Sequence, residues 1–393
     1  MLVGQKKAGR GLVAIAACAV IGLALSGCTI GDPHAEEVEE TAASAASAGP
    51  EISIKDGATG VSPMADISVH SAEGLDEVEM TNEAGKEVEA SYSDDRKDWG
   101  TDEVLGYGRS YTITATSSNG EESTVQFTTV SPVAQTNAYV VPADGATVGV
   151  GQTINFVFDN APTDKEAVEK AITIKTNPNV EGAFYWLSSN ELRWRPREYW
   201  PTGTEVEVNA DFYGLNMGSD YYGANDYSAS FTIGEEMRAV VDDTTKTMTI
   251  YKDGEEIKSM PVSLGTDSFP TFNGVYMVGD RVEDMVMDSS TYGLAISEGG
   301  YRTSVQYATQ LSYSGIYVHA APWSVWAQGS SNQSHGCINV STENAKWFMD
   351  NFKRGDIVEV KNTVGTELPG WDGLGSWNMS WEEWKAGGLT NES

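Results

Sequence analysis

One six-residue pattern, Asp-Gly-Ala-Thr followed by Gly and Val in either order, occurs twice in the first half of the chain. It stands at Asp56–Val61 and again at Asp144–Gly149. Each copy is followed by segments in which apolar and polar residues alternate, and a period of two indicates half-buried β-strands. Short strands and tight turns in a unit of about 100 residues are typical of an immunoglobulin-like sandwich. The repeat therefore predicts two such sandwiches, over residues 51–131 and 132–235.

A different pattern follows the second copy. Two alternating segments, Lys246–Tyr251 and Ile257–Ser263, flank Asp253-Gly254, which predicts a β-hairpin. A helix is expected after Ser341, a capping residue, because apolar residues recur there at helical spacing. Its predicted buried face consists of Ala345, Phe348, Met349 and Phe352, and further strands are expected at Gly274–Val278, Gly315–Val318 and Asp356–Val360.

The fold class follows from these patterns. We expect a mainly β chain in which two immunoglobulin-like β-sandwich modules precede a β-rich domain with one main helix. This third domain spans residues 236–362, and a Trp-rich C-terminal extension spans 363–393.

The N-terminus has the pattern of an export signal. Three basic residues precede an apolar run, Leu12–Leu25, which is short for a bilayer span and has the order of a secretory signal. Leu25-Ser26-Gly27-Cys28 resembles a lipobox, in which the cysteine becomes lipidated. We therefore expect a lipoprotein signal peptide over 1–27, lipidation at Cys28 and a flexible tether over 28–50. An ordinary signal peptide or a membrane anchor is the alternative.

Charge and cysteine usage restrict the partners of such a chain. The formal net charge is −32, which argues against binding to nucleic acid or to an anionic membrane surface. Contact with the membrane is expected only through the lipid on Cys28, on the outer face of the cell membrane, in the cell wall space. Once a leader containing Cys18 is removed, Cys28 and Cys337 remain, so no disulfide framework is expected.

Cys337 lies where a reactive thiol is expected. It follows Ser334-His335-Gly336, and His319 lies upstream. A cysteine attacks as its thiolate, so it needs a base nearby and N–H donors for the oxyanion. Gly336 permits a tight turn, and we expect the amides of Gly336 and Cys337 to point at that oxyanion. A zinc site would need three or four ligands, and an inert buried cysteine is the second alternative; we expect no metal and no cofactor.

This constellation resembles the L,D-transpeptidases of bacterial cell walls, built on the YkuD-type domain, in their actinobacterial lipoprotein form. The resemblance extends over residues 236–384 and implies a role for each matched residue: Cys337 as nucleophile, His319 as general base and acid, His335 as an orienting residue and the Gly336 amide as an oxyanion donor. The implied substrate-binding residues are Met287 in a lid over 280–303, Tyr301, Ser314, Gly315, Ser334 and Asn339. Ala320 departs from the Ser that relatives often carry, but its backbone carbonyl is the implied partner of His319.

The resemblance also implies a reaction. The thiolate attacks a tetrapeptide donor stem of peptidoglycan, releases the terminal D-alanine, and passes the acyl group to an acceptor stem in a 3→3 cross-link. Carbapenem β-lactams are expected as covalent inhibitors. An L,D-carboxypeptidase or endopeptidase using the same cysteine, and a catalytically silent wall-binding lipoprotein, are the alternatives.

Aromatic residues outside this constellation have two interpretations each. Those of the second sandwich, namely Trp186, Trp194, Trp200, Tyr221 and Tyr222, are expected to pack rather than to form a glycan-binding surface. We expect the extension's tryptophans to lie against the third domain as a structural element, with a sugar-binding strip as the alternative. Tyr213–Asp220 lies where some relatives hold calcium, but it carries only one acidic residue, so no ion is expected.

Overall fold

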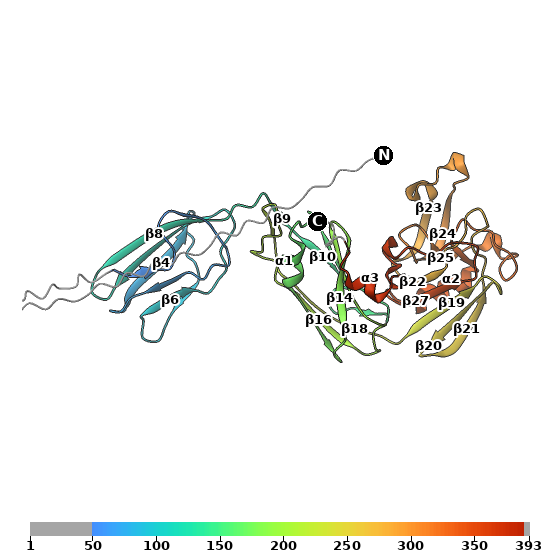
Figure 1. Ribbon diagram of the computed structural model, residues 1–393, viewed down its shortest axis with the longest axis horizontal. Coiled ribbons are helices and arrows are strands. Elements are labelled where there is room, and N and C mark those ends of the chain that lie inside the picture. The colour runs from blue at the N-terminus through green and yellow to red at the C-terminus, as the bar shows by residue number, and fades with distance from the viewer. Residues whose placement is uncertain (1–48, 389–393) are drawn as a thin grey trace, which may run out of the picture. The chain divides into compact units, whose positions relative to one another are not determined.

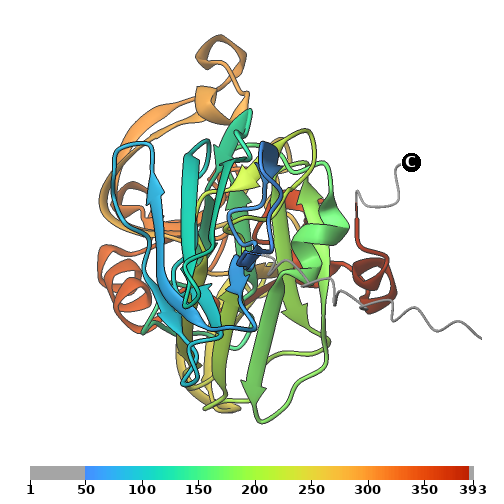
Figure 2. The ribbon, with the colours of Figure 1, turned by 90° about the vertical axis from the view of Figure 1, so that its left-hand side faces the viewer.

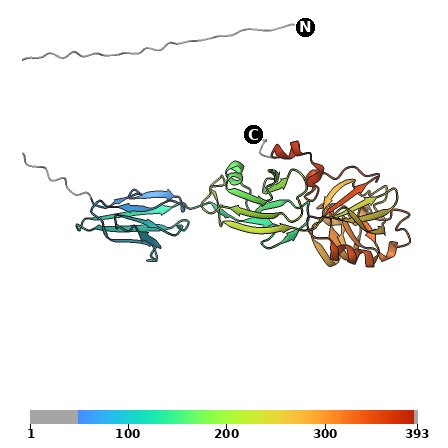
Figure 3. The same ribbon diagram turned by 90° about the horizontal axis from the view of Figure 1, so that it is seen from below.

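The computed structural model describes residues 49–388, and Figures 1, 2 and 3 show it from three sides. The predicted signal peptide, Cys28 and most of the tether lie outside these residues. Strands dominate throughout, as expected. Within residues 49–388, no helix has the length and apolarity needed to cross a membrane.

The first sandwich consists of two four-stranded sheets, in the orders β1-β3-β6-β5 and β2-β8-β7-β4. Its strands are β1 (Glu51–Ile52), β2 (Ala58–Val61), β3 (Ser68–His70), β4 (Leu75–Asn82), β5 (Ala90–Tyr92), β6 (Asp98–Thr101), β7 (Ser110–Ser117) and β8 (Glu122–Thr129). Inward-facing residues of both sheets form one core, which includes Ile67, Val69, Trp99, Ile113 and Phe127. The alternation in the sequence therefore corresponds to one buried and one solvated face of each sheet.

The second sandwich has sheets in the orders β10-β12-β15-β14 and β11-β18-β16-β13. Its strands are β10 (Ala138–Val141), β11 (Thr147–Val148), β12 (Ile154–Phe158), β13 (Ile172–Asn177), β14 (Gly182–Ser188), β15 (Glu191–Pro196), β16 (Glu205–Ala210) and β18 (Tyr227–Ile233), with α1 (Lys165–Lys170) and a small sheet of β9 (Ala134–Thr136) and β17 (Tyr221–Gly223) beside them. Trp186, Trp194 and Trp200 are buried in its core. Packing is therefore their role.

The repeated pattern has the same local structure in both copies. Asp56 Oδ1 accepts a hydrogen bond from the Gln126 amide at 2.9 Å, and Asp144 Oδ1 accepts one from the Ser230 amide at 2.8 Å. In each copy the short strand within the pattern pairs in parallel with the last long strand of its own sandwich, β2 with β8 and β11 with β18. The two sandwiches are thus closed by the same side-chain and strand contacts.

The third domain contains a five-stranded sheet in the order β21-β20-β19-β27-β22. Its strands are β19 (Met237–Asp242), β20 (Thr247–Lys252), β21 (Glu255–Pro261), β22 (Gly274–Met277) and β27 (Ile357–Lys361). The predicted hairpin is β20 and β21, and both residues of its turn, Asp253 and Gly254, have positive φ. Such a turn matches the right-handed twist of the flanking strands, which is why Asp-Gly is favoured there.

A second sheet of this domain, in the order β23-β24-β25-β26, is covered by the main helix. It consists of β23 (Arg281–Asp288), β24 (Arg302–Gln310), β25 (Tyr317–Ala320) and β26 (Ile338–Val340), and the helix is α2 (Thr342–Asn351). Ser341 caps the helix by accepting the Asn344 amide, as expected. Ala345, Phe348 and Phe352 are fully buried, whereas Met349 is half-buried. The hairpin of β23 and β24 projects beyond the rest of the sheet (Figures 1 and 2).

The C-terminal extension contacts the third domain as expected, through Asn378 and Val275, but its tryptophans Trp377 and Trp384 pack on the second sandwich. It forms η4 (Gly370–Asp372), η5 (Ser376–Asn378) and α3 (Trp381–Lys385), and α3 lies beside β14 of the second sandwich (Figure 1). The fully buried Trp384 stacks on Tyr185 at 4.8 Å and donates to the Ala183 carbonyl at 2.9 Å. Its partner is therefore the second sandwich, and the extension joins this sandwich to the third domain.

A buried cation explains this choice of surface. Arg195 of β15 is 2% exposed, and its guanidinium lies 4.5 Å from the Trp377 ring centroid and 4.6 Å from that of Trp384. Aromatic faces attract a desolvated cation. Burial lowers the pKa of Arg195 to about 10, so the side chain is still protonated at neutral pH.

Candidate active site

Two neighbouring strands of the third domain bring the predicted catalytic residues together. β25 and β26 run parallel, with His319 opposite Asn339. Cys337 immediately precedes β26, after Gly336 with φ of 120°. Cys337 and His319 therefore line one cavity of about 240 Å³. Residues from the hairpin of β23 and β24, from the loop before Cys337 and from β26 complete its wall, namely Met287, Tyr301, Thr303, Trp323, Gln333, Ser334, His335 and Asn339.

Cys337 is a buried thiol that is neutral at physiological pH. Its side chain is 4% exposed, and burial raises its pKa to about 11, although hydrogen bonds from the Tyr317 amide and the Tyr301 hydroxyl act in the opposite direction. The sulfur donates to the Gly315 carbonyl over 3.5 Å. A base must therefore remove the thiol proton before or during attack.

His319 lies on the same cavity and presents an unprotonated ring nitrogen. Its ring is buried, and its Nδ1 lies 3.0 Å from the Ala320 carbonyl oxygen. A carbonyl only accepts, so Nδ1 carries the proton and Nε2 is left unprotonated in the neutral ring. Burial lowers the pKa of His319 below its ordinary value. At neutral pH the thiol and the imidazole are thus both uncharged, which favours proton transfer over a resting ion pair.

The turn before Cys337 differs from our expectation for the oxyanion donors. The Gly336 amide donates to Ser334 Oγ at 3.1 Å, and Ser334 Oγ donates to the Cys337 carbonyl at 2.6 Å. The Gly336 carbonyl in turn accepts from Thr271 Oγ1 at 2.7 Å. We expected the Gly336 amide to point at an oxyanion. In this structure the amide instead donates its hydrogen bond to the Ser334 hydroxyl.

Comparisons with known proteins agree with this geometry. Residues 236–360 match the L,D-transpeptidase catalytic domain, and residues 58–216 match a bacterial Ig domain. L,D-transpeptidase 2 of Mycobacterium tuberculosis (strain CDC 1551 / Oshkosh) is 52% identical over 340 residues, covering 85% of this chain and 83% of that protein. The chain belongs to the L,D-transpeptidase family. L,D-transpeptidase 5 of M. tuberculosis (strain H37Rv) is 36% identical, with 84% of this chain and 74% of that protein covered.

A solved structure is also similar to this L,D-transpeptidase-family chain. It is the LD transpeptidase LdtMt1 in complex with imipenem, with a TM-score of 0.51 and 39% identity. The match covers 58% of this chain and all of the other. The bound imipenem belongs to that relative.

The segment that we expected to be a lid is the hairpin of β23 and β24, which carries two 3-10 turns, η1 (Ser289–Tyr292) and η2 (Ile296–Glu298). Met287 is buried beside Cys337. The Tyr292 hydroxyl lies 3.2 Å from that of Tyr317, and a Cβ on Gly315 would lie 2.8 Å from the Tyr292 ring. Gly315 must therefore be glycine, and this hairpin packs against the turn that contains it.

His335 is held between two aromatic rings. Its ring centroid lies 4.7 Å from that of Phe269 and 5.0 Å from that of Tyr301. Tyr301 is the residue whose hydroxyl bonds the thiol. The structure thus places His335 against Tyr301, while His319 is the imidazole with a backbone partner in the cavity.

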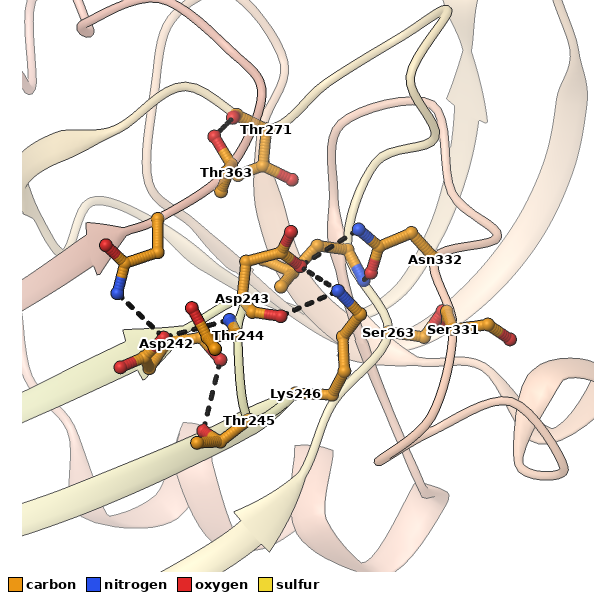
Figure 4. A network of polar contacts seen from close by, with 12 residues as sticks. Asp242, Asp243, Thr244, Thr245, Lys246, Ser263, Thr271, Ser331, Asn332 and Thr363 are labelled. Carbon is orange, nitrogen blue, oxygen red and sulfur yellow. Dashed lines mark hydrogen bonds and ion pairs between the residues drawn. The ribbon is translucent and has the colours of Figure 1, made fainter.

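A polar network fixes the end of the loop that leads to Cys337 (Figure 4). Asn332 Nδ2 donates to Asp243 Oδ1 at 2.9 Å, and Lys246 Nζ donates to the same oxygen at 2.8 Å. Ser263 Oγ donates to the Ser331 carbonyl at 2.8 Å. These bonds tie the loop to the five-stranded sheet just before Ser334.

Sequence reasoning missed several residues of the site. Thr303, Trp323 and Gln333 line the cavity, and Trp323 lies 6.1 Å from the His319 ring. Trp323 is about half exposed. A large apolar residue in the loop between His319 and Cys337 could have indicated from the sequence that this residue lines the site. Neither Ser314 nor Gly315, which we expected to bind substrate, is among the residues that line the cavity, although the Gly315 carbonyl contacts the Cys337 sulfur.

Proposed function

We propose that this chain is a peptidoglycan L,D-transpeptidase that forms 3→3 cross-links through an acyl-enzyme on Cys337. The observation that carries the proposal is the pairing of a buried, neutral thiol with a buried imidazole whose Nε2 is free to accept a proton, both on one cavity. Family membership supplies the substrate class. The imipenem complex of a relative supports a cavity that accepts strained acyl donors.

The first half of the reaction acylates the enzyme. His319 Nε2 takes the Cys337 proton as the sulfur attacks the carbonyl carbon of the donor tetrapeptide that precedes its terminal D-alanine. The C–N bond then breaks, and the proton on His319 goes to the departing amine. D-Alanine leaves, and a thioester joins Cys337 to the remaining stem peptide.

The second half transfers the acyl group to an acceptor. The side-chain amine of a second stem attacks the thioester, His319 accepts a proton from this amine, and the thiol is restored. We assign the oxyanion to the Cys337 amide and the Tyr301 hydroxyl; the Gly336 amide joins them only if it leaves Ser334 Oγ. Two N–H or O–H donors at the attacked carbonyl would stabilise the charge that develops on its oxygen.

Asn339 is proposed to bind the substrate backbone. Its side chain is 3% exposed, its Nδ2 donates to Ser324 Oγ at 3.2 Å, and its Oδ1 is buried without a partner in the described part of the chain. A buried acceptor without a donor is costly. A stem-peptide N–H would satisfy it, so Asn339 would orient the donor in the cavity.

The same site catalyses L,D-carboxypeptidase chemistry if water replaces the amine, and this is the second candidate function. We also propose that the enzyme acts outside the cytoplasm, attached through a lipid on Cys28. The identity of Cys28 as a lipidation site is tested by the mass of the membrane-extracted protein, which would exceed that of the cleaved chain by a diacylglyceryl group.

A defined disaccharide-tetrapeptide tests the proposed function. With donor alone, the intact mass of the enzyme should rise by the stem acyl group without its D-alanine. With donor and acceptor together, a 3→3 dimer should appear in solution. Free tripeptide without dimer would favour the carboxypeptidase, and unchanged donor would contradict both candidates.

A further inference from the structure

The turn between β24 and β25 holds the sulfur of Cys337. The sulfur donates to the Gly315 carbonyl, which lies in this turn. The turn, over Ser312–Ile316, is closed by the Ile316 amide donating to Ser312 Oγ at 2.8 Å. Its position therefore decides where the thiol proton points before attack.

A carboxylate from the C-terminal extension fixes this turn. Asp372 at the end of η4 is 5% exposed. Its Oδ1 accepts the Tyr313 amide at 2.8 Å, and its Oδ2 accepts the Ser314 amide at 3.1 Å. Two successive peptide groups just before Gly315 are thus bound to one side chain, and hydrogen bonds to a carboxylate are among the stronger ones.

Arg193 of the second sandwich binds the residue that follows Asp372. Arg193 of β15 is fully buried, and its guanidinium donates to the Gly373 carbonyl, next to Asp372. The guanidinium also lies 5.9 Å from the Tyr313 ring centroid. Glu191 pairs with Arg193 at 2.5 Å and so holds the guanidinium in place.

We propose that Asp372 is a positioning residue for acyl transfer: together with Arg193 of the second sandwich, it holds the Tyr313–Gly315 peptides so that the Gly315 carbonyl keeps the Cys337 sulfur in its attacking position. The proposal rests on the function assigned to Cys337 above. It makes the C-terminal extension and the second immunoglobulin-like module part of the catalytic apparatus. A displacement of about 1 Å at a reacting atom costs up to roughly 100-fold in rate.

The test uses the full exported chain and Asp372→Asn, which keeps the shape but loses one acceptor. The second-order rate of carbapenem acylation and the rate of alkylation by iodoacetamide are measured side by side, with the thermal midpoint. Acylation requires a sulfur oriented toward the bound carbonyl, whereas alkylation by a small reagent requires only access and ionisation of the thiol. Glu382→Gln, in the exposed Glu382–Lys385 pair of the same extension, is the matched control.

We expect Asp372→Asn to slow acylation by roughly 10- to 100-fold, with the same final adduct mass and little change in alkylation. Arg193→Gln should slow it in the same sense, whereas Arg197→Gln, in an exposed ion pair of the same sandwich, should not. The proposal is overturned if a carbapenem acylates Asp372→Asn at the wild-type rate. Faster alkylation with a lower thermal midpoint overturns it too, because a 4% exposed thiol reacts faster once the fold loosens. No adduct on the wild type would instead contradict the proposed function, so the two failures are distinguishable.

Discussion

Replacement of His319 by Gln should change the shape of the pH profile as well as the rate. The thiol pKa of about 11 leaves a thiolate fraction of only ~10⁻⁴ at pH 7. The wild type avoids this limit because neutral His319 takes the proton during attack. Since burial lowers the pKa of His319, the base form exists above that lowered pKa. Activity should therefore persist below pH 6.5 and be lost as the pH falls through the lowered pKa of His319 in the folded protein.

Without the imidazole, only thiol that has already ionised reacts. His319→Gln should lower carbapenem acylation at pH 7 by roughly 10²- to 10⁴-fold. The remaining rate should rise about tenfold per pH unit up to the thiol pKa, whereas the wild-type rate should be nearly level from pH 7 to 9. The assay is single-turnover loss of β-lactam absorbance across this pH range.

His70→Gln serves as the control, because His70 pairs with Asp98 on the exposed surface of the first sandwich. It should behave as the wild type. Parallel profiles for wild type and His319→Gln, whatever their rates, would refute the assignment of His319 as the base.

Two further variants test the site and its support. Tyr301→Phe removes a hydroxyl that lowers the thiol pKa, so acylation should fall on the order of 100-fold and alkylation should shift to higher pH; an unshifted alkylation profile would remove Tyr301 from the site. Trp384→Ala removes a fully buried indole and should cost about 3–5 kcal/mol in the free energy of unfolding, whereas Trp326→Ala, at a largely exposed side chain, should cost under about 0.5 kcal/mol. Equal losses measured by denaturant titration would show that the extension does not stabilise the fold.

Features determined by neighbouring residues were predictable from the sequence. The Asp253-Gly254 hairpin and the Ser341 cap depend on local backbone preferences, and both were found. The site was predicted from the Ser334–Cys337 motif, the upstream His319 and the family resemblance, and the structure places Cys337 and His319 on one cavity.

Features determined by distant partners were not predictable. The Trp384 indole needed burial, but its partners Tyr185 and Ala183 lie about 200 residues away in the chain and have no local signal. We expected the Gly336 amide to point at an oxyanion, but it donates to the Ser334 hydroxyl. This contact depends on the rotamer of the Ser334 side chain, which the sequence does not specify. Asp372 was missed for the same reason, since its partners are amides of a remote turn.

The acyl-enzyme on Cys337 is tested most directly by intact mass spectrometry after incubation with a carbapenem. The strained lactam offers the thiolate the same kind of carbonyl as the stem peptide, and its amine stays attached to the adduct. The wild type should gain the mass of one drug molecule, and Cys337→Ala, with an unchanged circular dichroism spectrum, should gain none. An adduct on both proteins would place the reactive group elsewhere, and an adduct on neither would indicate a wall-binding scaffold without catalysis.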